Sequence, residues 1–310
     1  MDTANTKILI LGSGVIGSIY AVKLSKAGYD VTMLARSHRL KEIRENGLLF
    51  FNDNINTVEK ANIKIIDKIA ADDFFDYIFV TVRYEQIEFA LKDIKNNCSQ
   101  NIVTMVNNPF GYSEWEQIVG ESKIIPAFPG AGGKIENGVL YYKLTPRIVQ
   151  PTTLGELSGN RGFRINKLYN ILKHSGFPSS ICNNMDAWQK SHLAMVIPLA
   201  NGIYFDGRNN YTTARNKEAI NSMTLSLREN FNFLKKNGIK ITPTKLNVFI
   251  WCPRWLLNQI LKTIYKTKFA ETLISNHAIN AKQEMKLLNN DFAYLAESKG
   301  SSLRFLNHGH

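Results

Sequence analysis

The sequence predicts an α/β fold: an N-terminal doubly wound parallel sheet followed by a mostly α-helical C-terminal domain. In the first half, short apolar runs alternate with segments of helical periodicity, which is typical of parallel strands joined by crossover helices. From about Asp186 onward the pattern changes to long amphipathic stretches, interrupted mainly by Pro243 and Pro253. A chain of 310 residues is expected to form two domains, which we predict at 1–184 and 185–310.

The individual elements follow from the same patterns. A polar stretch at 179–186 is the predicted linker, and two short segments, 139–142 and 147–150, are predicted to pair as an antiparallel extension of the sheet. The predicted strands are 7–11, 30–34, 63–66, 77–82 and 102–107, and the predicted helices are 15–26, 38–46, 85–95, 163–174, 187–205, 212–237, 244–265 and 268–299.

Composition excludes several classes of protein. The three cysteines, Cys98, Cys182 and Cys252, are scattered and lie in no CxxC or Cys/His pattern, so neither disulfides nor a metal site is predicted. No apolar stretch approaches the roughly 20 residues of a membrane-spanning helix. The first residues show no signal-peptide pattern. We therefore expect a cytoplasmic protein without a membrane partner.

The net charge of +12 is carried mainly by the second half of the chain. Residues 185–310 contain 17 Lys and Arg against 8 Asp and Glu, whereas residues 1–184 contain 21 against 18. Because these basic residues are dispersed at helical spacing, a solvated basic surface is favoured over a nucleic-acid-binding site. We predict no nucleic-acid partner, and leave the oligomeric state open with a homodimer as one alternative.

A glycine motif, GxGxxG, follows the first predicted strand and opens the first predicted helix. A second strand comes next, and this context is typical of a Rossmann dinucleotide-binding unit. The first glycine allows a tight turn, the second lets the backbone approach a pyrophosphate, and the third lets helix and strand pack closely. A glycine-rich turn without a ligand is the alternative. The six candidate cofactor-binding residues are Gly12, Ser13, Gly14, Val15, Ile16 and Gly17.

The end of the second strand bears on the choice of cofactor. Enzymes that use NAD normally place Asp or Glu there to bind the ribose hydroxyls, but this chain has Arg36 and Arg39 nearby and no acid. A guanidinium suits bidentate contact with a 2′-phosphate. We therefore predict NADP(H) as the cofactor and Arg36 as a ligand of its phosphate. Arg39 is left open between the same role and an ordinary surface position.

Together these features resemble the ketopantoate reductase (2-dehydropantoate 2-reductase) family over essentially the whole chain. The family's namesake reaction belongs to pantothenate biosynthesis. Each further landmark is short, but their order and spacing agree with the family pattern. They are Val80-Thr81-Val82-Arg83, Asn107-Asn108-Pro109-Phe110-Gly111, Trp188-Gln189-Lys190 and Lys282-Gln283-Glu284-Met285.

The resemblance implies roles for particular residues. Arg83 and Asn108 would bind the cofactor, Lys190 would be the catalytic lysine, and Glu284 the catalytic acid. Hydride would pass from the nicotinamide to a ketone while the lysine stabilises or protonates the developing alkoxide. The helical domain would serve substrate binding and dimerisation. Without the resemblance, Lys190 could equally be a lysine extending to water from a helix end.

Two positions depart from the family pattern. The family has Asn one and two helical turns after the catalytic lysine, where this chain has Ala194 and Pro198. A spacing of four residues keeps all three positions on one helix face. Two hydrogen-bonding groups are thus missing from the expected pocket, which points to a divergent substrate pocket and a less polar or differently shaped substrate. The nearby His192 is expected to be a packing or surface residue.

We therefore predict an NADPH-dependent oxidoreductase that reduces a 2-oxo acid or related ketone to the hydroxy compound. A catalytically inactive NADP(H)-binding sensor or regulatory protein is the alternative, because of Ala194 and Pro198. Neither the physiological substrate nor the reaction direction follows from the sequence.

Overall fold

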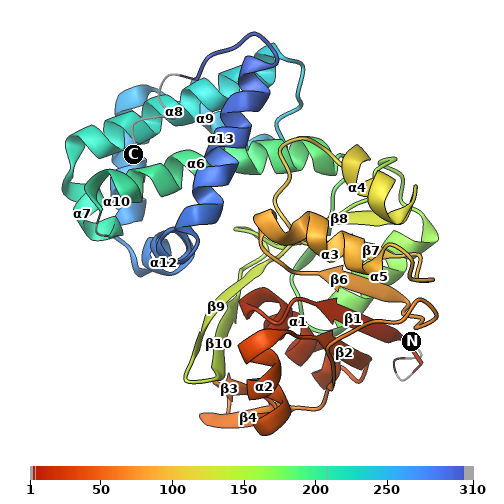
Figure 1. Cartoon of the computed structure of the whole chain (residues 1–310). Helices are drawn as coiled ribbons and strands as arrows, with labels where there is room; N and C mark the ends of the chain where they lie inside the picture. The colour runs from red at the N-terminus through yellow and green to blue at the C-terminus, as the bar shows by residue number, and fades with distance from the viewer. Residues whose placement is uncertain (1–2, 4, 208, 304–310) are drawn as a thin grey trace. The chain divides into compact units, whose positions relative to one another are not determined.

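The computed structural model describes residues 3, 5–207 and 209–303. The chain divides into two compact units. The first contains Met1–Val106 and Tyr112–Met185, and the second contains Asn107–Gly111 and Asp186–His310. A short loop from the first half of the chain therefore belongs to the second unit. The predicted fold class, a Rossmann-like sheet followed by a helical region, is confirmed (Figure 1).

The first unit is built on an eight-stranded sheet. The strands from β8 to β5 are mutually parallel, whereas β11 runs antiparallel to β8 and pairs in parallel with β12. In spatial order the strands are β12 (Ser179–Ile181), β11 (Thr152–Leu154), β8 (Ile124–Phe128), β7 (Ile102–Thr104), β6 (Tyr77–Val80), β1 (Lys7–Leu11), β2 (Asp30–Leu34) and β5 (Lys64–Ile66).

Both faces of this sheet are buried, as expected for parallel strands with crossover helices. Alternate residues of β1 point to opposite faces: Ile8 and Ile10 join one apolar cluster, and Leu9 and Leu11 join another. The first cluster includes residues of α1 (Val15–Lys26) and α5 (Phe163–His174), and the second includes residues of α3 (Ile87–Ile94) and α4 (Ser113–Val119). The remaining short helices of this unit are α2 (Ser37–Asn46) and η1 (Tyr84–Gln86).

A second, four-stranded sheet packs against the other side of α1. It contains, in order, β4 (Thr57–Ala61), β3 (Leu48–Asn52), β10 (Val139–Leu144) and β9 (Ala131–Glu136). Helix α1 contacts strands of both sheets. It is consequently apolar or small on nearly all sides, which is the composition of a helix buried all round.

The strand pairing predicted after residue 138 was wrong. Residues 139–144 pair with 131–136, and residues 147–150 lie in a turn. The connection is the two-residue turn Asn137-Gly138, in which both residues have positive φ, 50° and 79°. Asn-Gly is the strongest short hairpin signal, so the pairing partner lay before this dipeptide. The hairpin also belongs to the second sheet and not to an extension of the first.

The linker predicted at residues 179–186 was wrong over Ser179–Ile181, which forms β12 at the edge of the large sheet, although the boundary between the two units, at Met185 and Asp186, falls within it. A polar edge strand with two serines resembles a loop in composition. The β3–β4 hairpin was missed as well. Its burial is confined to a few positions such as Leu48 and Phe50, which pack toward α1.

All regular structure described in the second unit is helical. The predicted stretches are subdivided at particular residues. Asn216 accepts from the backbone N–H groups of Glu218 and Ala219 and so starts a new helix, and Pro253 precedes another. The helices are α6 (Met185–Asp206), α7 (Asn210–Arg215), α8 (Lys217–Lys236), η2 (Thr244–Asn247), α9 (Val248–Trp251), α10 (Arg254–Tyr265), α11 (Lys268–Ala270), the π-helical η3 (Glu271–Ser275), α12 (Asn276–Asn280) and α13 (Lys282–Glu297).

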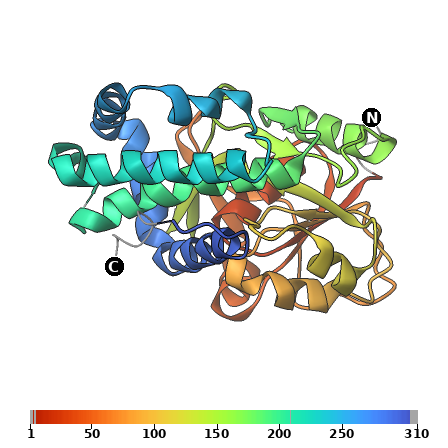
Figure 2. The same ribbon diagram turned by 90° about the horizontal axis from the view of Figure 1, so that it is seen from above.

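Figure 2 shows the same elements from above, with α6 and α8 among the longest helices of the chain. Within residues 3, 5–207 and 209–303, no helix combines the length and the apolar character that a membrane crossing requires.

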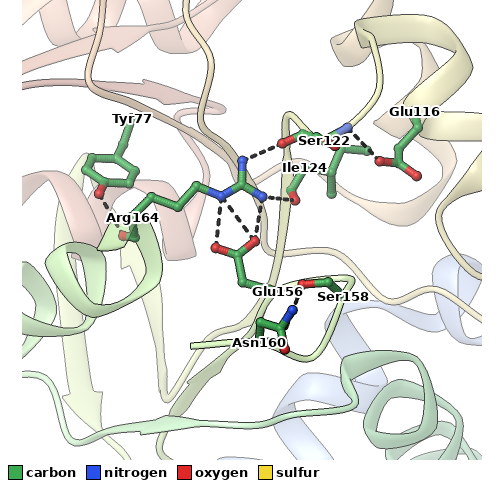
Figure 3. A network of polar contacts seen from close by, with 8 residues as sticks. All are labelled: Tyr77, Glu116, Ser122, Ile124, Glu156, Ser158, Asn160 and Arg164. Carbon is green, nitrogen blue, oxygen red and sulfur yellow. Dashed lines mark hydrogen bonds and ion pairs between the residues drawn. The ribbon is translucent and has the colours of Figure 1, made fainter. Parts of the chain in front are cut away.

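A polar network around Arg164 joins several segments of the first unit (Figure 3). Its Nε donates to both carboxylate oxygens of Glu156, at 2.9 and 3.1 Å, and its Nη2 donates to Oε2 at 2.5 Å. Its Nη groups also donate to the carbonyl oxygens of Ser122 and Ile124. The Tyr77 hydroxyl donates to the Arg164 carbonyl, and burial raises the pKa of this hydroxyl, which keeps it a donor.

Glu156→Gln is expected to lower the free energy of unfolding by about 2 kcal/mol, because an amide leaves the Arg164 guanidinium without its counter-charge. Glu156 is only 8% exposed, so water compensates little. Urea denaturation measures the change. Glu136→Gln is the control, since Glu136 pairs with Lys134 on the surface and surface pairs contribute little. Equal losses in the two variants would contradict this role of the network.

Candidate functional site

The glycine motif forms the turn between β1 and α1. Gly12 has φ of +118°, and a Cβ there would lie 3.0 Å from backbone atoms of Thr81. A Cβ on Gly17 would lie 1.8 Å from the carbonyl oxygen of Gly12. The Thr81 hydroxyl donates to the carbonyl oxygens of Leu11 and Gly12, at 3.2 and 3.0 Å. The turn is therefore closed by backbone contacts that only glycine permits at positions 12 and 17.

The middle glycine has a different environment. A Cβ on Gly14 would meet no described atom within 4 Å, and Gly14 is exposed. It is the N-cap of α1, and none of the described side chains caps the helix there. The N–H groups of the first turn, at Val15, Ile16 and Gly17, thus face an open approach. These residues fit the pyrophosphate of a dinucleotide, which helix N-termini bind through such N–H groups.

Arg36 lies at the end of β2, beside the glycine turn, and is the N-cap of α2. Its guanidinium lies over the Phe89 ring, 5.0 Å from the centroid, and its Nη2 forms an ion pair with Asp93. The side chains of Arg36 and Asp93 are 43% and 25% exposed. Arg36 thus follows the strand at whose end this fold binds an adenosine ribose, and a carboxylate already contacts its guanidinium.

Arg39 is not an ordinary surface residue. Its side chain is only 16% exposed, and it pairs with Glu42 one helical turn further on. Its Nε donates to the Ser13 carbonyl at 3.3 Å, which links α2 to the glycine turn. Its Nη2 is buried and has no partner among the described residues. A buried donor without a partner is costly, so this guanidinium has an unused capacity to bind an anion.

Arg83 follows β6, the other neighbour of β1, and is exposed at the start of η1. The carboxyl ends of β1, β2 and β6 meet at one edge of the sheet, because the three strands are parallel. Arg36, Arg83 and the glycine turn are therefore brought to the same edge.

Asn108 is 3% exposed and uses its side chain within its own loop. Its Oδ1 accepts from the backbone N–H groups of Phe110 and Gly111, both at 3.0 Å, and its Nδ2 donates to the Gly111 carbonyl at 2.5 Å. This loop, Asn107–Gly111, belongs to the second unit. The structure thus gives Asn108 a loop-closing role, and its contact with the cofactor stays a prediction.

Lys190 lies in the second turn of α6 and is 9% exposed. Its Nζ donates to both carboxylate oxygens of Asp186, at 2.5 and 2.6 Å. Asp186 is one helical turn earlier, in the first turn of α6, where the helix dipole favours a carboxylate. Gly111 lies close by, since a Cβ there would be 3.4 Å from Asp186 Oδ1. The lysine is therefore a nearly buried ammonium with a fixed counter-ion.

The face of α6 beyond Lys190 carries no polar side chain at the two expected positions. Ala194 is fully buried, and Pro198 interrupts the helical hydrogen bonding because it has no N–H. The carbonyl of Ala194, four residues before Pro198, therefore lacks its usual backbone donor. The Asn230 side chain on α8 donates to this carbonyl instead, at 3.2 Å. His192 stacks on Trp188 with ring planes 7° apart, which is a packing contact.

Glu284 lies in the first turn of α13, in the same unit as Lys190, and is half-buried. Helix α13 contacts the second half of α6, where the Asn201 side chain donates to Asn289 at 2.9 Å. The Tyr204 hydroxyl donates to the carbonyl of Ala278, just before α13. The carboxylate that the structure places on the Lys190 ammonium is that of Asp186, and the role of Glu284 stays a prediction.

Comparison with known proteins agrees with this arrangement. A family model described as Ketopantoate reductase PanE/ApbA matches residues 8–153. The chain is 25% identical over 305 residues to the 2-dehydropantoate 2-reductase of Pyrococcus abyssi, with 91% of this chain and 95% of that protein covered. Together these matches support the ketopantoate reductase family as the family that this chain resembles over most of its length.

Solved structures show the same fold. A 2-dehydropantoate 2-reductase from Geobacter metallireducens has a TM-score of 0.76 at 16% identity, with 98% of this chain and 97% of that chain covered. A ternary structure of D-mandelate dehydrogenase with NADH and anilino(oxo)acetate has a TM-score of 0.77 at 15% identity, with coverage of 97% and 95%. The family and the dehydrogenase neighbours support an oxidoreductase, and the ketopantoate reductase family uses a nicotinamide cofactor.

Two carboxylates of the site were missed in the sequence. Asp186 could have been found, because an acid four residues before a lysine on a predicted helix indicates an ion pair. Asp93 had no such signal, since it is 57 residues from Arg36 and is brought to it by the packing of α3.

The second and third glycines of the motif are expected to respond oppositely to alanine. Gly17→Ala should lower the free energy of unfolding by about 3 kcal/mol, because its Cβ collides with backbone. Gly14→Ala should leave stability within about 0.5 kcal/mol. It should nevertheless weaken binding of NADPH and NADH by about tenfold, since a methyl group blocks the approach to the helix N-terminus.

Thermal denaturation and calorimetric titration with each dinucleotide measure the two effects. A Gly14→Ala variant that is stable and binds both dinucleotides as tightly as the wild type would rule out this turn as the pyrophosphate site.

Proposed function

We propose that the chain is an NADP(H)-dependent reductase that converts a 2-oxo acid or related ketone into the hydroxy compound, with Lys190 as the catalytic lysine. The observation that carries the proposal is the nearly buried Lys190 ammonium, held by Asp186, in a chain whose glycine turn is open for a dinucleotide.

The environment of Lys190 suits proton donation to a substrate oxygen. An ammonium has three N–H donors, and two of its hydrogen bonds go to the Asp186 carboxylate. The third donor has no partner among the described residues and is available to a carbonyl oxygen. When bound, the nicotinamide supplies the hydride that reduces the carbonyl carbon. Lys190 then meets the negative charge that develops on the oxygen and gives it a proton.

Asp186 acts through Lys190 as a positioning residue. Its two oxygens fix the direction of the ammonium. Asp186 is itself 44% exposed, so water can restore the proton that the lysine gives up. Glu284, on α13 of the same unit, is proposed as the second acid of the site on the strength of the family motif alone.

The substrate is proposed to be a 2-oxo acid with a predominantly apolar side chain. Ala194 and Pro198 offer no side-chain hydrogen bond, and a site without polar groups gains nothing from a substrate hydroxyl. The structural similarity to D-mandelate dehydrogenase with anilino(oxo)acetate supports the same direction, since that ligand carries an aromatic group beside its oxo acid.

The preference for NADP(H) is proposed from the two arginines at the end of β2. Arg36 is half-exposed, and Arg39 has a buried donor without a described partner. Both suit a 2′-phosphate. The D-mandelate dehydrogenase structures contain NADH, so cofactor preference depends on the residues of each chain and has to be measured here.

Purified protein should oxidise NADPH in the presence of one or more 2-oxo acids with apolar side chains, faster than with ketopantoate. Lys190→Ala should lower kcat by about a thousandfold, because the ammonium proposed to meet the alkoxide is lost. Lys266→Ala, at the exposed C-cap of α10 in the same unit, is the matched control. Tight NADPH binding without turnover of any ketone would favour the alternative, a sensor that has lost catalysis.

Arg36→Ala is expected to weaken NADPH binding by about thirtyfold, or ~2 kcal/mol, because a charged hydrogen bond to the 2′-phosphate is lost. NADH, which has no such phosphate, should bind within about twofold of its wild-type affinity. Arg44→Ala is the control, since Arg44 lies on the same helix and pairs with Asp67. Calorimetric titration gives the affinities, and equal wild-type affinity for the two dinucleotides would refute the preference.

A further inference from the structure

Asp93 is the charged group closest to the arginine on which NADP(H) preference depends. It lies on α3, one helical turn after Phe89. Both side chains contact the guanidinium of Arg36: the Phe89 ring lies against one face, and the Asp93 carboxylate forms an ion pair with Nη2. No other partner of Arg36 is found among the described residues. The arginine is thus already oriented before any cofactor binds.

This arrangement opposes a second anion on the same guanidinium. A 2′-phosphate carries up to two negative charges and, when bound to Arg36, would lie a few ångströms from the Asp93 carboxylate. Like charges at such a distance repel each other, and this repulsion is large where both groups are partly shielded from water. The Asp93 side chain is three-quarters buried, so its charge is only partly screened. The phosphate must therefore displace the Asp93 carboxylate from Arg36 or bind beside it at the cost of this repulsion.

We propose that Asp93 is a specificity-determining residue that competes with the 2′-phosphate of NADP(H) for Arg36 and so limits the preference over NAD(H). This inference rests on the proposed NADP(H) site. NAD(H), which has a hydroxyl in place of the phosphate, leaves the Arg36–Asp93 pair intact. The sequence contains no acid at the end of β2, and the structure supplies one from α3.

Asp93→Asn is the variant that tests the proposal, because it removes the charge with almost no change in shape. The probes are NADPH, NADH and the adenosine fragments 2′,5′-ADP and 5′-ADP, titrated by calorimetry into the full chain. The fragments lack the nicotinamide, so their binding does not depend on catalysis. We expect NADPH and 2′,5′-ADP to bind about tenfold more tightly than to the wild type, and NADH and 5′-ADP to change by less than about twofold.

Glu88→Gln is the matched control. Glu88 lies on the same helix and pairs with Lys92, so the substitution removes the same charge without freeing Arg36. It should leave all four affinities unchanged. The gain in affinity for NADPH and 2′,5′-ADP in Asp93→Asn should also shrink as salt is raised from about 0.05 to about 0.5 M. Salt screens the repulsion between Asp93 and the phosphate in the wild type, so less repulsion remains for the substitution to remove. A thermal melt of each variant confirms that it is folded.

Two results would overturn the proposal. Unchanged affinities in Asp93→Asn would show that the carboxylate does not compete with the phosphate. Weaker binding of NADH and 5′-ADP would show that Asp93 binds ribose hydroxyls and favours NAD(H). Failure of the wild type to bind NADPH would contradict the proposed function itself, whereas wild-type binding with an unresponsive Asp93→Asn contradicts only the role of Asp93.

Discussion

Helix α1 is the middle layer of the first unit, and its position depends on a contact between Gly17 and Gly12 that leaves no room for a side chain. The Cα of Gly17 lies so close to the carbonyl of Gly12 that a Cβ would be 1.8 Å from that oxygen. The contact brings the start of α1 onto the end of β1, and the helix then packs against both sheets. As a consequence the N-terminus of the helix, our proposed pyrophosphate site, stays open while most of the helix is buried.

Fold elements were predictable where one local pattern determined them. Strands such as Lys7–Leu11 are apolar because both faces are buried, and helices such as Phe163–His174 show one apolar face. The second sheet was not predictable in the same way. Its strands alternate weakly because α1 and, at β3, α2 cover only part of them, and β3 pairs with β10 about ninety residues later. Such a long-range pairing leaves no trace in either segment alone.

The site divides in the same manner. The glycine turn could be recognised from its strand–turn–helix setting, whereas Lys190 was singled out by the family resemblance and its catalytic role stays a prediction. The groups that control their charge come from elsewhere. Arg36 meets Asp93 from another crossover helix, and Arg39 meets the carbonyl of Ser13. Local motifs thus indicate which ligand binds, while tertiary contacts determine the electrostatic environment in which it does so.

The altered positions after Lys190 are coupled to the core of the helical unit. Pro198 cannot donate to the Ala194 carbonyl, and the fully buried Asn230 on α8 supplies the missing donor. A polar residue in the core has therefore taken over a backbone hydrogen bond that a non-proline residue at 198 would make for itself. Replacing Pro198 by Asn would return an N–H to the helix and set it in competition with Asn230 for one carbonyl. The loss of polar groups on this face is thus built into the packing of α6 against α8, which ties the proposed substrate preference to the core of the helical unit.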